Sequence, residues 1–163
     1  MSGGVDSSIA AHLLKSQNYK VYGLHFKTVN DILFSLYPEK QNVCPSSSDT
    51  TDAIKVAERL KLDDFHIVDI KEEFKDKIIK YFIETYKSGK TPNPCILCNR
   101  YFKFGKAIEI SKKIGADYIS SGHYIIREYS RNYRTEVLKK GVDNYKDQSY
   151  FLSYIKKDII SYL

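Results

Sequence analysis

The feature that most constrains this chain is a short glycine-serine turn that leads directly into an apolar helical pattern. The turn reads Ser2-Gly3-Gly4-Val5-Asp6-Ser7-Ser8, and the apolar-periodic run spans 9–14. Glycines have no Cβ, so the backbone can turn tightly there and approach an anion closely. The unpaired N–H groups that open the helix point toward such an anion, and the serine hydroxyls add donors. The turn therefore predicts a phosphate-binding loop, although the G-x-x-x-x-G-K-[ST] spacing of a Walker loop is absent.

The order S-G-G-x-D-S resembles the pyrophosphate loop (PP-loop) of ATP pyrophosphatases. Those enzymes cleave ATP between its α and β phosphates to adenylate an acceptor, so the resemblance implies that chemistry here. The alternative is a glycine-serine stretch that arose by chance in a flexible terminus. The position of Asp6 and the helical pattern that follows it favour the loop.

Composition narrows the class of protein. The 163 residues suit a single domain, and the net charge of +6 with a pI near 9.0 favours a polyanionic partner, although lysine-rich helix faces give the same value. An odd count of three cysteines indicates a reducing compartment. The sequence shows no apolar run of membrane-spanning length and no leader pattern. We therefore expect a cytoplasmic protein without a membrane partner.

Strand and helix patterns alternate along the chain. Strands are predicted at 21–26, 65–68 and 116–120, and helices at 52–60 (capped by Asp49 or Thr50), 74–86 and 104–114 (capped by Gly115). This alternation predicts an α/β fold, with an open, mostly parallel sheet and helices on both faces. Ligands of such sheets bind at the carboxyl ends of the strands. We expect one domain over 1–163, with 124–140 forming a hairpin arm.

A strand is missing from this pattern, because a phosphate loop of this kind should follow a strand and only Met1 precedes Ser2. A buried central strand contributes several apolar side chains, each stabilising the fold by roughly 1.5–3 kcal/mol. We therefore expect that the sequence is clipped at its amino end. A strand supplied by another chain is the alternative.

The second strong signal is the run 91–100, Thr-Pro-Asn-Pro-Cys-Ile-Leu-Cys-Asn-Arg. Its two prolines predict a rigid, extended approach to a helix. Cys98 falls near the predicted helix start, where the helix amino end, Arg100 and Lys103 would lower the pKa of its thiol and make it nucleophilic. The alternative is a pair of buried, inert cysteines.

Four motifs together resemble tRNA-specific 2-thiouridylases (tRNA-uridine 2-sulfurtransferases) over nearly the whole chain. They are S-G-G-V-D-S-S at 2–8, T-P-N-P-C-I-L-C-N-R at 91–100 with Lys103-Phe104, G-H-Y at 122–124, and K-D-Q-S-Y-F-L at 146–152. The resemblance implies the Rossmann-like adenine nucleotide α-hydrolase fold. It also implies ATP-dependent 2-thiolation of the wobble uridine of tRNA (U34). In that reaction ATP adenylates the C2 oxygen, and sulfur carried on a cysteine displaces AMP.

The resemblance also assigns residues to roles. ATP would be bound by Met1, Ser2, Gly3, Gly4, Val5, Asp6, Ser7, Ser8, Phe26, Gly122 and His123. The target base would meet Asn93, Pro94 and Cys95, and the tRNA would meet Lys146, Asp147 and Gln148. Cys98 would be the catalytic nucleophile, and Asp6 would hold Mg²⁺ or orient the loop. The expected partners are tRNA and a sulfur-donor protein, either a cysteine desulfurase or a relay protein.

The chain departs from the family pattern in three ways. Cys95 stands where many members have aspartate, and Ile126 takes the place of an arginine, with Arg127 following it. The family's second catalytic cysteine and its later tRNA-binding domains lie beyond Leu163. We therefore expect a catalytic domain that is also clipped at its carboxyl end.

Because Cys95 replaces an aspartate, the sulfur could reach the uridine by two routes. Cys44, Cys95 and Cys98 are three thiolates that could hold an iron–sulfur cluster with one open site. Equally, Cys98 could carry the sulfur as a persulfide without a cluster. Structural zinc, with His25 or His123 as a fourth ligand, is a weaker alternative because neither histidine has diagnostic spacing.

Two other functions fit part of the sequence. One is another PP-loop ligase that adenylates a small metabolite, and the other is a truncated nucleotide-binding module without turnover. The N-P-C-x-x-C and K-D-Q-S-Y-F motifs argue against the first, and the intact loop argues against the second. Release of AMP and pyrophosphate with and without tRNA would separate all three.

Overall fold

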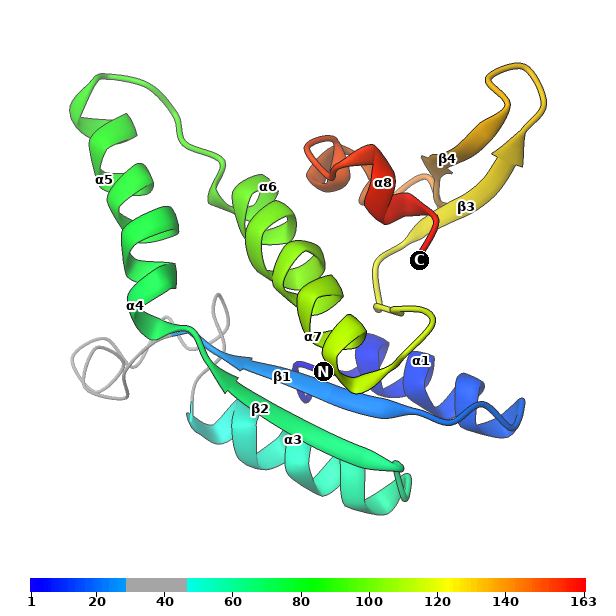
Figure 1. Cartoon of the computed structure of the whole chain (residues 1–163). Coiled ribbons are helices and arrows are strands. Elements are labelled where there is room, and N and C mark those ends of the chain that lie inside the picture. Colours follow the sequence, from blue (N-terminus) through cyan, green and yellow to red (C-terminus); the bar gives the residue numbers. More distant parts are fainter. Residues whose placement is uncertain (29–46) are drawn as a thin grey trace. The chain divides into compact units, whose positions relative to one another are not determined.

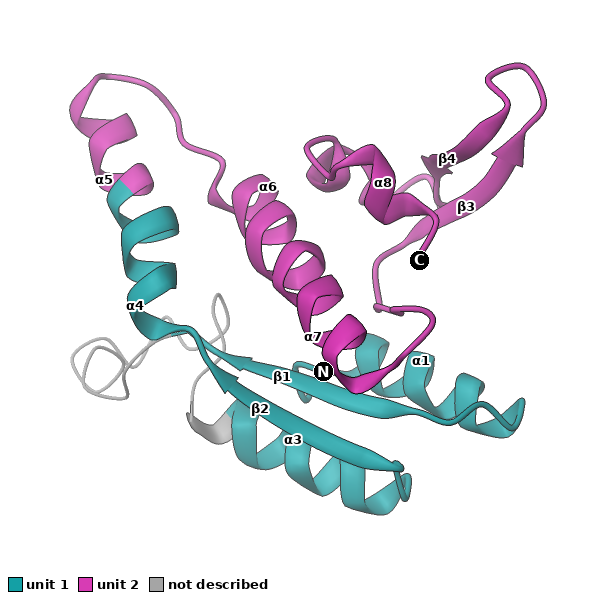
Figure 2. Cartoon of the chain, viewed as in Figure 1, with its two compact units in different colours: residues 1–80 teal, residues 81–163 magenta. Residues whose placement is uncertain are grey.

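A computed structural model describes residues 1–28 and 47–163 of the chain, with 47 and 48 as backbone only. Cys44, one of the three cysteines of the predicted cluster, lies outside these residues. The chain divides into two compact units, residues 1–80 (unit 1) and residues 81–163 (unit 2) (Figure 2). Each unit is described by itself, and the single domain expected over 1–163 stays a prediction.

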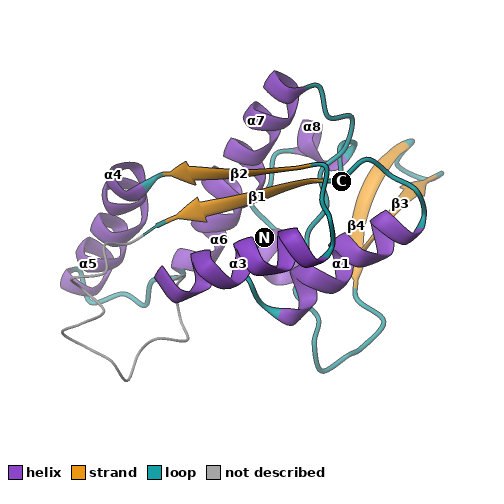
Figure 3. Cartoon of the chain, turned by 90° about the horizontal axis from the view of Figure 1, so that it is seen from below, coloured by secondary structure: helices purple, strands orange, loops and turns teal. Residues whose placement is uncertain are grey.

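Unit 1 contains a parallel βαβ arrangement (Figure 1). Its elements are α1 (Val5–Ser16), β1 (Tyr22–Lys27), α3 (Ser47–Arg59) and β2 (Asp64–Asp69). The two strands pair in parallel, with Tyr22 opposite Asp64 and Lys27 opposite Asp69. Helices α1 and α3 lie on the same face of this strand pair (Figure 3). The predicted α/β class, with parallel strands joined through helices, is confirmed.

Helix α3, which connects β1 to β2, begins earlier than the predicted residue 52. Helix α3 starts at Ser47, so Asp49 and Thr50 lie in its first turns, and their assignment as the cap is wrong. A further helical run follows β2 without a break. It consists of α4 (Lys71–Phe74), the π-helical η2 (Lys75–Ile79) and α5 (Lys80–Lys87). Phe74 and Ile78 are buried, as the predicted helix over 74–86 requires.

Unit 2 includes α5 from Tyr81 onward and then one long helical run, which starts well before the predicted residue 104. It comprises α6 (Pro94–Cys98), the π-helical η3 (Asn99–Lys106) and α7 (Ala107–Ile114). Pro94 occupies the first helical position, where its missing N–H costs nothing. Gly115 ends the run with a left-handed φ of 72°, so the predicted carboxyl-terminal cap is confirmed. No helix in the described ranges is both long and apolar enough to cross a membrane.

The rest of unit 2 packs on this helical run. It contains the antiparallel hairpin β3 (Ile125–Ser130) and β4 (Thr135–Lys140), the 3₁₀ turn η4 (Ser149–Leu152) and α8 (Lys157–Ile160). The hairpin lies within the range predicted for an arm. The core of this unit is formed by Phe104, Ile108, Leu152 and Ile159, against which Ile125 and Leu138 of the hairpin pack. The hairpin base is therefore fixed by the same core that holds the long helix.

The strand predicted at 116–120 is wrong, because this segment has no strand conformation. A strand exists through its pairing, and no strand of the described residues pairs with this segment. One of its backbone groups is satisfied differently, since the Ile119 N–H donates to the Tyr162 carbonyl oxygen at 2.7 Å. The apolar pattern there instead buries Ile119 against the core of unit 2.

Candidate functional site

The predicted phosphate loop of unit 1 is a turn closed by its own serine hydroxyls. The Gly4 N–H donates to Ser2 Oγ at 3.3 Å, and the Ser7 and Ser8 hydroxyls donate to the Gly4 carbonyl at 3.2 and 2.8 Å. Ser2 and Ser7 also face each other, with their Oγ atoms 3.3 Å apart. Gly4 is the amino-terminal cap of α1, and as a glycine it has no side chain with which to cap the first turn. A helix amino end of this kind suits an anion.

Gly3 fixes where this loop lies. Its φ is +81°, and a Cβ built there would approach the Asp49 carbonyl oxygen to 3.0 Å and the Ala53 nitrogen to 3.2 Å. The loop thus packs tightly against the start of α3, at a position where only glycine combines the backbone angle with the available space. The tight turn predicted for the glycines is therefore present at Gly3, whereas their close approach to an anion stays a prediction.

His25 has a structural role in this site that the sequence analysis did not predict. It is 1% exposed, its Nδ1 lies 2.8 Å from the Met1 carbonyl oxygen, and its Nε2 lies 2.9 Å from Thr50 Oγ1. Burial lowers the pKa of this imidazole, partly offset by the Met1 hydrogen bond. Both ring nitrogens are occupied, so His25 joins the loop to α3 and is unsuited to be the zinc ligand considered from the sequence. Its position inside a period-2 strand is the one signal that indicated burial.

The other residues assigned to ATP in unit 1 surround the loop. Met1 donates from its amino group to the Leu24 carbonyl, which aligns the start of the loop with β1. Val5 and Asp6 lie exposed in the first turn of α1, with the carboxylate of Asp6 near the helix amino end. Phe26 is half-buried toward the carboxyl end of β1. Unit 1 therefore brings together the nucleotide residues predicted from Met1 to Phe26.

In unit 2, the residues predicted to meet the target base open the long helix. Asn93 precedes the helix as its cap, and its N–H donates to the Tyr81 hydroxyl at 3.4 Å. Cys95 is exposed and Cys98, three residues later, is half-buried. Residues three apart on a helix lie on one face, so the two thiols share a side of α6.

The predicted cause of Cys98 activation needs correction. The helix begins at Pro94, so Cys95 is its second residue and Cys98 lies a full turn further in. The field of a helix end weakens beyond the first turn, so the helix end does not account for the predicted activation of Cys98. Arg100 lies over the rings of Tyr101 and Tyr154, at 5.8 and 5.6 Å from their centroids.

Asn99 ties the cysteine helix to the K-D-Q-S-Y-F-L motif. The side chain is 2% exposed, and its Nδ2 donates to the Phe151 carbonyl at 3.0 Å. Its Oδ1 is buried with no hydrogen-bond partner among the described residues. Burying half of an amide unpaired costs free energy, which the Phe151 bond and the packing around it must offset. Sequence reasoning did not predict that Asn99, the residue after Cys98, joins the two motifs.

The G-H-Y and K-D-Q motifs also meet directly. Gln148 accepts the Tyr124 N–H through Oε1 at 3.0 Å, and its own N–H donates to the Tyr124 carbonyl at 3.2 Å. The ammonium of Lys146 lies 5.6 Å from the centroid of the Tyr124 ring. Two segments that are far apart in the sequence are therefore held together by three contacts.

Asp147, between Lys146 and Gln148, binds backbone and side-chain groups of the neighbouring turn, so its carboxylate is not free on the surface. Its Oδ1 accepts the N–H groups of Gly141 and Ser149 at 3.2 and 3.1 Å, and its Oδ2 accepts the Ser149 hydroxyl at 2.8 Å. Burial alone would raise the pKa of this carboxyl, but the hydrogen bonds from Ser149 and Gly141 outweigh it and lower the pKa. Of the three residues assigned to tRNA, this one is bound chiefly by its own chain.

His123 packs against the helix that carries Cys98. Its ring lies 5.4 Å from that of Phe104, and its Nδ1 lies 2.9 Å from Ser121 Oγ. Burial, helped by the charge of Lys103, lowers the pKa of His123 to about 4. The imidazole is therefore neutral at neutral pH, where it can donate or accept a hydrogen bond but carries no charge.

The structure groups the predicted residues into two sets. Unit 1 holds the ATP residues from Met1 to Phe26, and unit 2 holds Gly122, His123, the target-base residues, the tRNA residues and Cys98. No group of three or more metal-binding side chains exists within 1–28 and 47–163. A cluster site would need Cys44, so the metal assignment is untested.

The chain is similar to known proteins over its whole length. The family model described as tRNA methyl transferase HUP domain matches residues 1–163. Among curated relatives, tRNA-specific 2-thiouridylase MnmA of Petrotoga mobilis is 71% identical over 160 residues, covering 98% of this chain and 44% of that protein. MnmA of Thermotoga sp. (strain RQ2) is 46% identical over 156 residues (96% and 43%), and MnmA of Clostridium acetobutylicum is 45% identical over 160 residues (97% and 43%). The chain thus spans less than half the length of these relatives.

Proposed function

This chain belongs to the family described as the tRNA methyl transferase HUP domain, and we propose that it carries out ATP-dependent 2-thiolation of the wobble uridine of tRNA. The relatives named above are tRNA-specific 2-thiouridylases. The observation that carries the proposal is the meeting of three motifs in unit 2. Asn99 joins the cysteine helix to Phe151, and Gln148 joins the K-D-Q segment to Tyr124 of G-H-Y.

The loop of unit 1 fits a nucleotide phosphate. It offers the N–H groups at the start of α1, the hydroxyls of Ser2, Ser7 and Ser8, and a glycine backbone packed against α3. As substrate, ATP would supply an adenylyl group that turns the C2 oxygen of the uridine into a leaving group. Phe26 would line the adenine, and Asp6 would hold Mg²⁺ on the phosphates, since an exposed carboxylate suits that ion.

Unit 2 would receive the RNA. Asn93, Pro94 and Cys95 surround the start of the helix at which the target base would be placed, and Lys146 and Gln148 would contact the tRNA backbone. The wobble base lies in a single-stranded loop, where leaving the stack costs only a few kcal/mol. Gly122 and His123 are the residues of this unit that the family resemblance assigns to ATP. Because the imidazole of His123 is neutral at neutral pH, it would bind the nucleotide through hydrogen bonds and not through charge.

Cys98 would deliver the sulfur by one of two routes. In the first, Cys98 carries it as a persulfide received from a donor protein. The outer sulfur attacks C2 and displaces AMP, and a thiol reductant then cleaves the S–S bond to Cys98, which leaves the sulfur on the base. In the second, thiolates of Cys44, Cys95 and Cys98 hold an iron–sulfur cluster that supplies a site for sulfide. The thiols of Cys95 and Cys98 on one helix face fit either donor set. Iron content after anaerobic purification separates the routes, because only a colourless, iron-free chain that still thiolates tRNA fits the first.

The partners of this reaction follow from its chemistry. We propose tRNA as substrate, a cysteine desulfurase or relay protein as sulfur donor, and the cytoplasm as the location. The charge of +6 favours the polyanionic substrate.

The test is to incubate the chain with ATP, Mg²⁺, tRNA, a thiol reductant and a sulfur source, and to measure AMP, pyrophosphate and 2-thiouridine. The sulfur source is a cysteine desulfurase with cysteine for the persulfide route and sulfide for the cluster route. We expect all three products only with tRNA, and none with a tRNA that has cytidine at the wobble position. Release of AMP that needs a small metabolite and not tRNA would instead support a ligase. ATP binding without release would support a nucleotide-binding module without turnover.

A further inference from the structure

The turn of the β3–β4 hairpin carries a surface that the proposed chemistry does not use. We call this surface the arm tip and define it by Tyr129, Arg131, Tyr133 and Arg134, all of them exposed. Tyr129 is 59% and Tyr133 is 77% exposed. Tyr133 lies in the turn and not in a strand, so the preference of tyrosine for strands does not account for it.

The arm tip is positively charged because the acidic residues of the hairpin are already paired. Glu128 forms an ion pair with Lys139 across the strands, and Glu136 pairs with Arg127 at 3.7 Å. Arg131 and Arg134 have no acidic partner within ion-pair distance among residues 1–28 and 47–163. Their two charges therefore face solvent uncompensated.

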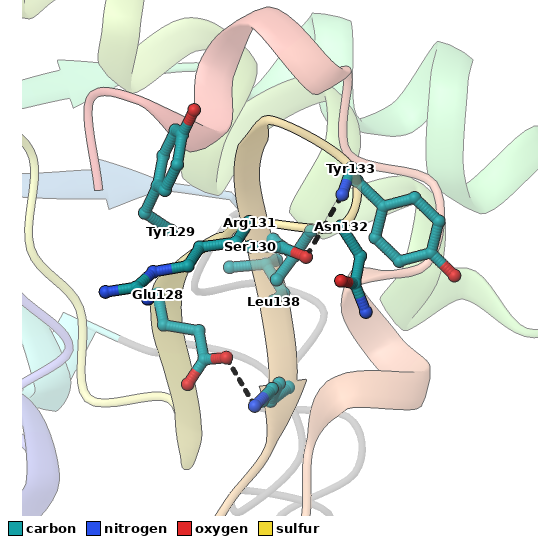
Figure 4. Close-up of a pocket in the computed structure, with 9 residues that line it drawn as sticks. Glu128, Tyr129, Ser130, Arg131, Asn132, Tyr133 and Leu138 are labelled. Carbon is teal, nitrogen blue, oxygen red and sulfur yellow. Dashed lines mark hydrogen bonds and ion pairs between the residues drawn. The ribbon is translucent and has the colours of Figure 1, made fainter.

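The tip has a defined shape (Figure 4). The Tyr133 N–H donates to Ser130 Oγ at 3.4 Å, and Arg134 holds a left-handed φ of 49°. Figure 4 shows the rings of Tyr129, at the end of β3, and Tyr133, in the turn, on different sides of the hairpin end, with the paired Glu128 carboxylate below them. Both tyrosines line an open pocket. A closed turn presents these side chains with less loss of entropy than a flexible loop would.

The base of the hairpin is anchored beside the residues assigned to tRNA. Ile125 and Leu138 pack on the core of unit 2, and Arg127 Nη1 donates to the Ser161 carbonyl at 3.2 Å. Tyr124, the residue before β3, makes the two backbone contacts with Gln148. With strands of about 3.3 Å per residue, six residues place the arm tip roughly 20 Å from that contact.

Arginine and exposed tyrosine together match one class of partner. Guanidinium groups bind phosphates, and an exposed ring can stack on an unpaired base. An acidic protein would pair with the arginines but would leave the rings without a specific role. We propose that the arm tip is a second RNA-binding surface, at which Arg131 and Arg134 bind backbone phosphates of the substrate and Tyr133 stacks on an unpaired base. This inference rests on the proposed tRNA substrate and extends its contacts beyond the reacting base.

The test measures tRNA binding by the chain as a function of salt. The double variant Arg131→Gln/Arg134→Gln should bind about tenfold more weakly at low salt, and the slope of log K against log salt should shrink by about 1.5–2. Tyr133→Ser should bind about tenfold more weakly with little change in that slope, whereas Tyr133→Phe should bind like the unmodified chain.

A matched control separates loss of charge at the arm tip from loss of charge in general. Lys61→Gln/Lys113→Gln removes the same charge from exposed positions elsewhere, and Lys61 shares with Arg134 a φ of 49°. If the arm-tip variant binds tRNA no worse than this control, the inference is overturned, while tRNA-dependent AMP release would leave the proposed function standing. Binding of an acidic protein but not of tRNA at the tip would also overturn it. Failure of the unmodified chain to bind any RNA would overturn both.

Discussion

The two units of this chain make their candidate sites in different ways. In unit 1, seven consecutive residues form the phosphate loop, and their hydrogen bonds run between residues at most five apart. In unit 2, the site comes from three segments joined by bonds that span 24 and 52 residues. The first site is a local structure, whereas the second exists only once the unit has packed.

This difference predicts which substitutions disrupt each site. A local loop fails when its own backbone is strained, and the rest of the unit can survive. A site assembled from distant segments fails when packing or hydrogen bonding between them is lost, even where no substrate is touched. The following substitutions are designed to separate these two kinds of failure.

The largest expected effect is at the proposed nucleophile. Cys98→Ala should abolish formation of 2-thiouridine, because Cys98 carries the sulfur in the first proposed route and holds the cluster in the second. ATP and tRNA binding should persist, since the helix keeps its length and its contacts. Nucleoside analysis of the tRNA measures the product, and Cys98→Ser serves as a second variant that preserves size. Retained thiolation in either variant would remove Cys98 from its role.

The next effect is the acid sensitivity of unit 2. The pKa of folded His123 is about 4, against an ordinary value of 6.5. Between these values the unfolded chain binds a proton that the folded chain does not, so stability falls as the pH falls through this window. The loss from this residue reaches at most about 3 kcal/mol by pH 4 and is absent above pH 6.5.

Urea unfolding at pH 4.5 and pH 7 measures this loss. His123→Leu should lower the difference in unfolding free energy between the two pH values. A residual difference should remain, because the pKa of buried His25 is lowered as well. An unchanged difference in the variant would contradict the assigned burial of His123.

In unit 1, Gly3→Ala tests the local loop. A left-handed φ costs a non-glycine residue roughly 1–2 kcal/mol, and the added Cβ would also crowd the Asp49 carbonyl at 3.0 Å. We expect ATP binding to weaken at least tenfold, measured by equilibrium titration. Gly89→Ala is the matched control, because its φ is +74° and a Cβ there meets nothing within 4 Å. Equal ATP affinity in the two variants would show that the loop tolerates displacement.

The smallest effect tests the link between motifs in unit 2. Asn99→Ala removes the donor to Phe151 and should lower the unfolding free energy by about 1 kcal/mol. It should also weaken tRNA binding severalfold while leaving ATP binding by unit 1 unchanged. Ser111→Ala removes a buried hydroxyl bonded only within its own helix, to Ile108 at 2.9 Å, and should cost similar stability without affecting tRNA. Identical tRNA affinities would contradict a positioning role for Asn99.

Local signals in the sequence predicted local structure well. The glycine turn, the strands at β1 and β2 and the Gly115 cap are encoded by residues within one turn or strand, and each lies where it was predicted. The start of the cysteine helix was misjudged because Pro94 was interpreted as part of an extended approach. Proline suits an extended segment and a first helical position equally, so the pattern alone does not distinguish them.

Contacts between segments that are distant along the chain could not be predicted from the sequence. His25 lies in no motif, and Asn99 lies in one that assigns it no role, yet both bind partners that are 24 and 52 residues away along the chain. The strand at 116–120 failed for the same reason, since its alternating apolar pattern needs a neighbour with which to pair. The periodicity of apolar residues predicts which face of an element is buried. It does not predict which other segment packs on that face.

The most direct measurement of the central claim follows one oxygen atom. If the C2 oxygen of the wobble uridine is adenylated and then displaced by sulfur, that oxygen must leave in AMP. A tRNA labelled with ¹⁸O at this position should therefore yield AMP carrying one ¹⁸O in its phosphate, in equal amount to the 2-thiouridine formed. AMP without the label, formed together with 2-thiouridine, would contradict activation of the uridine by ATP.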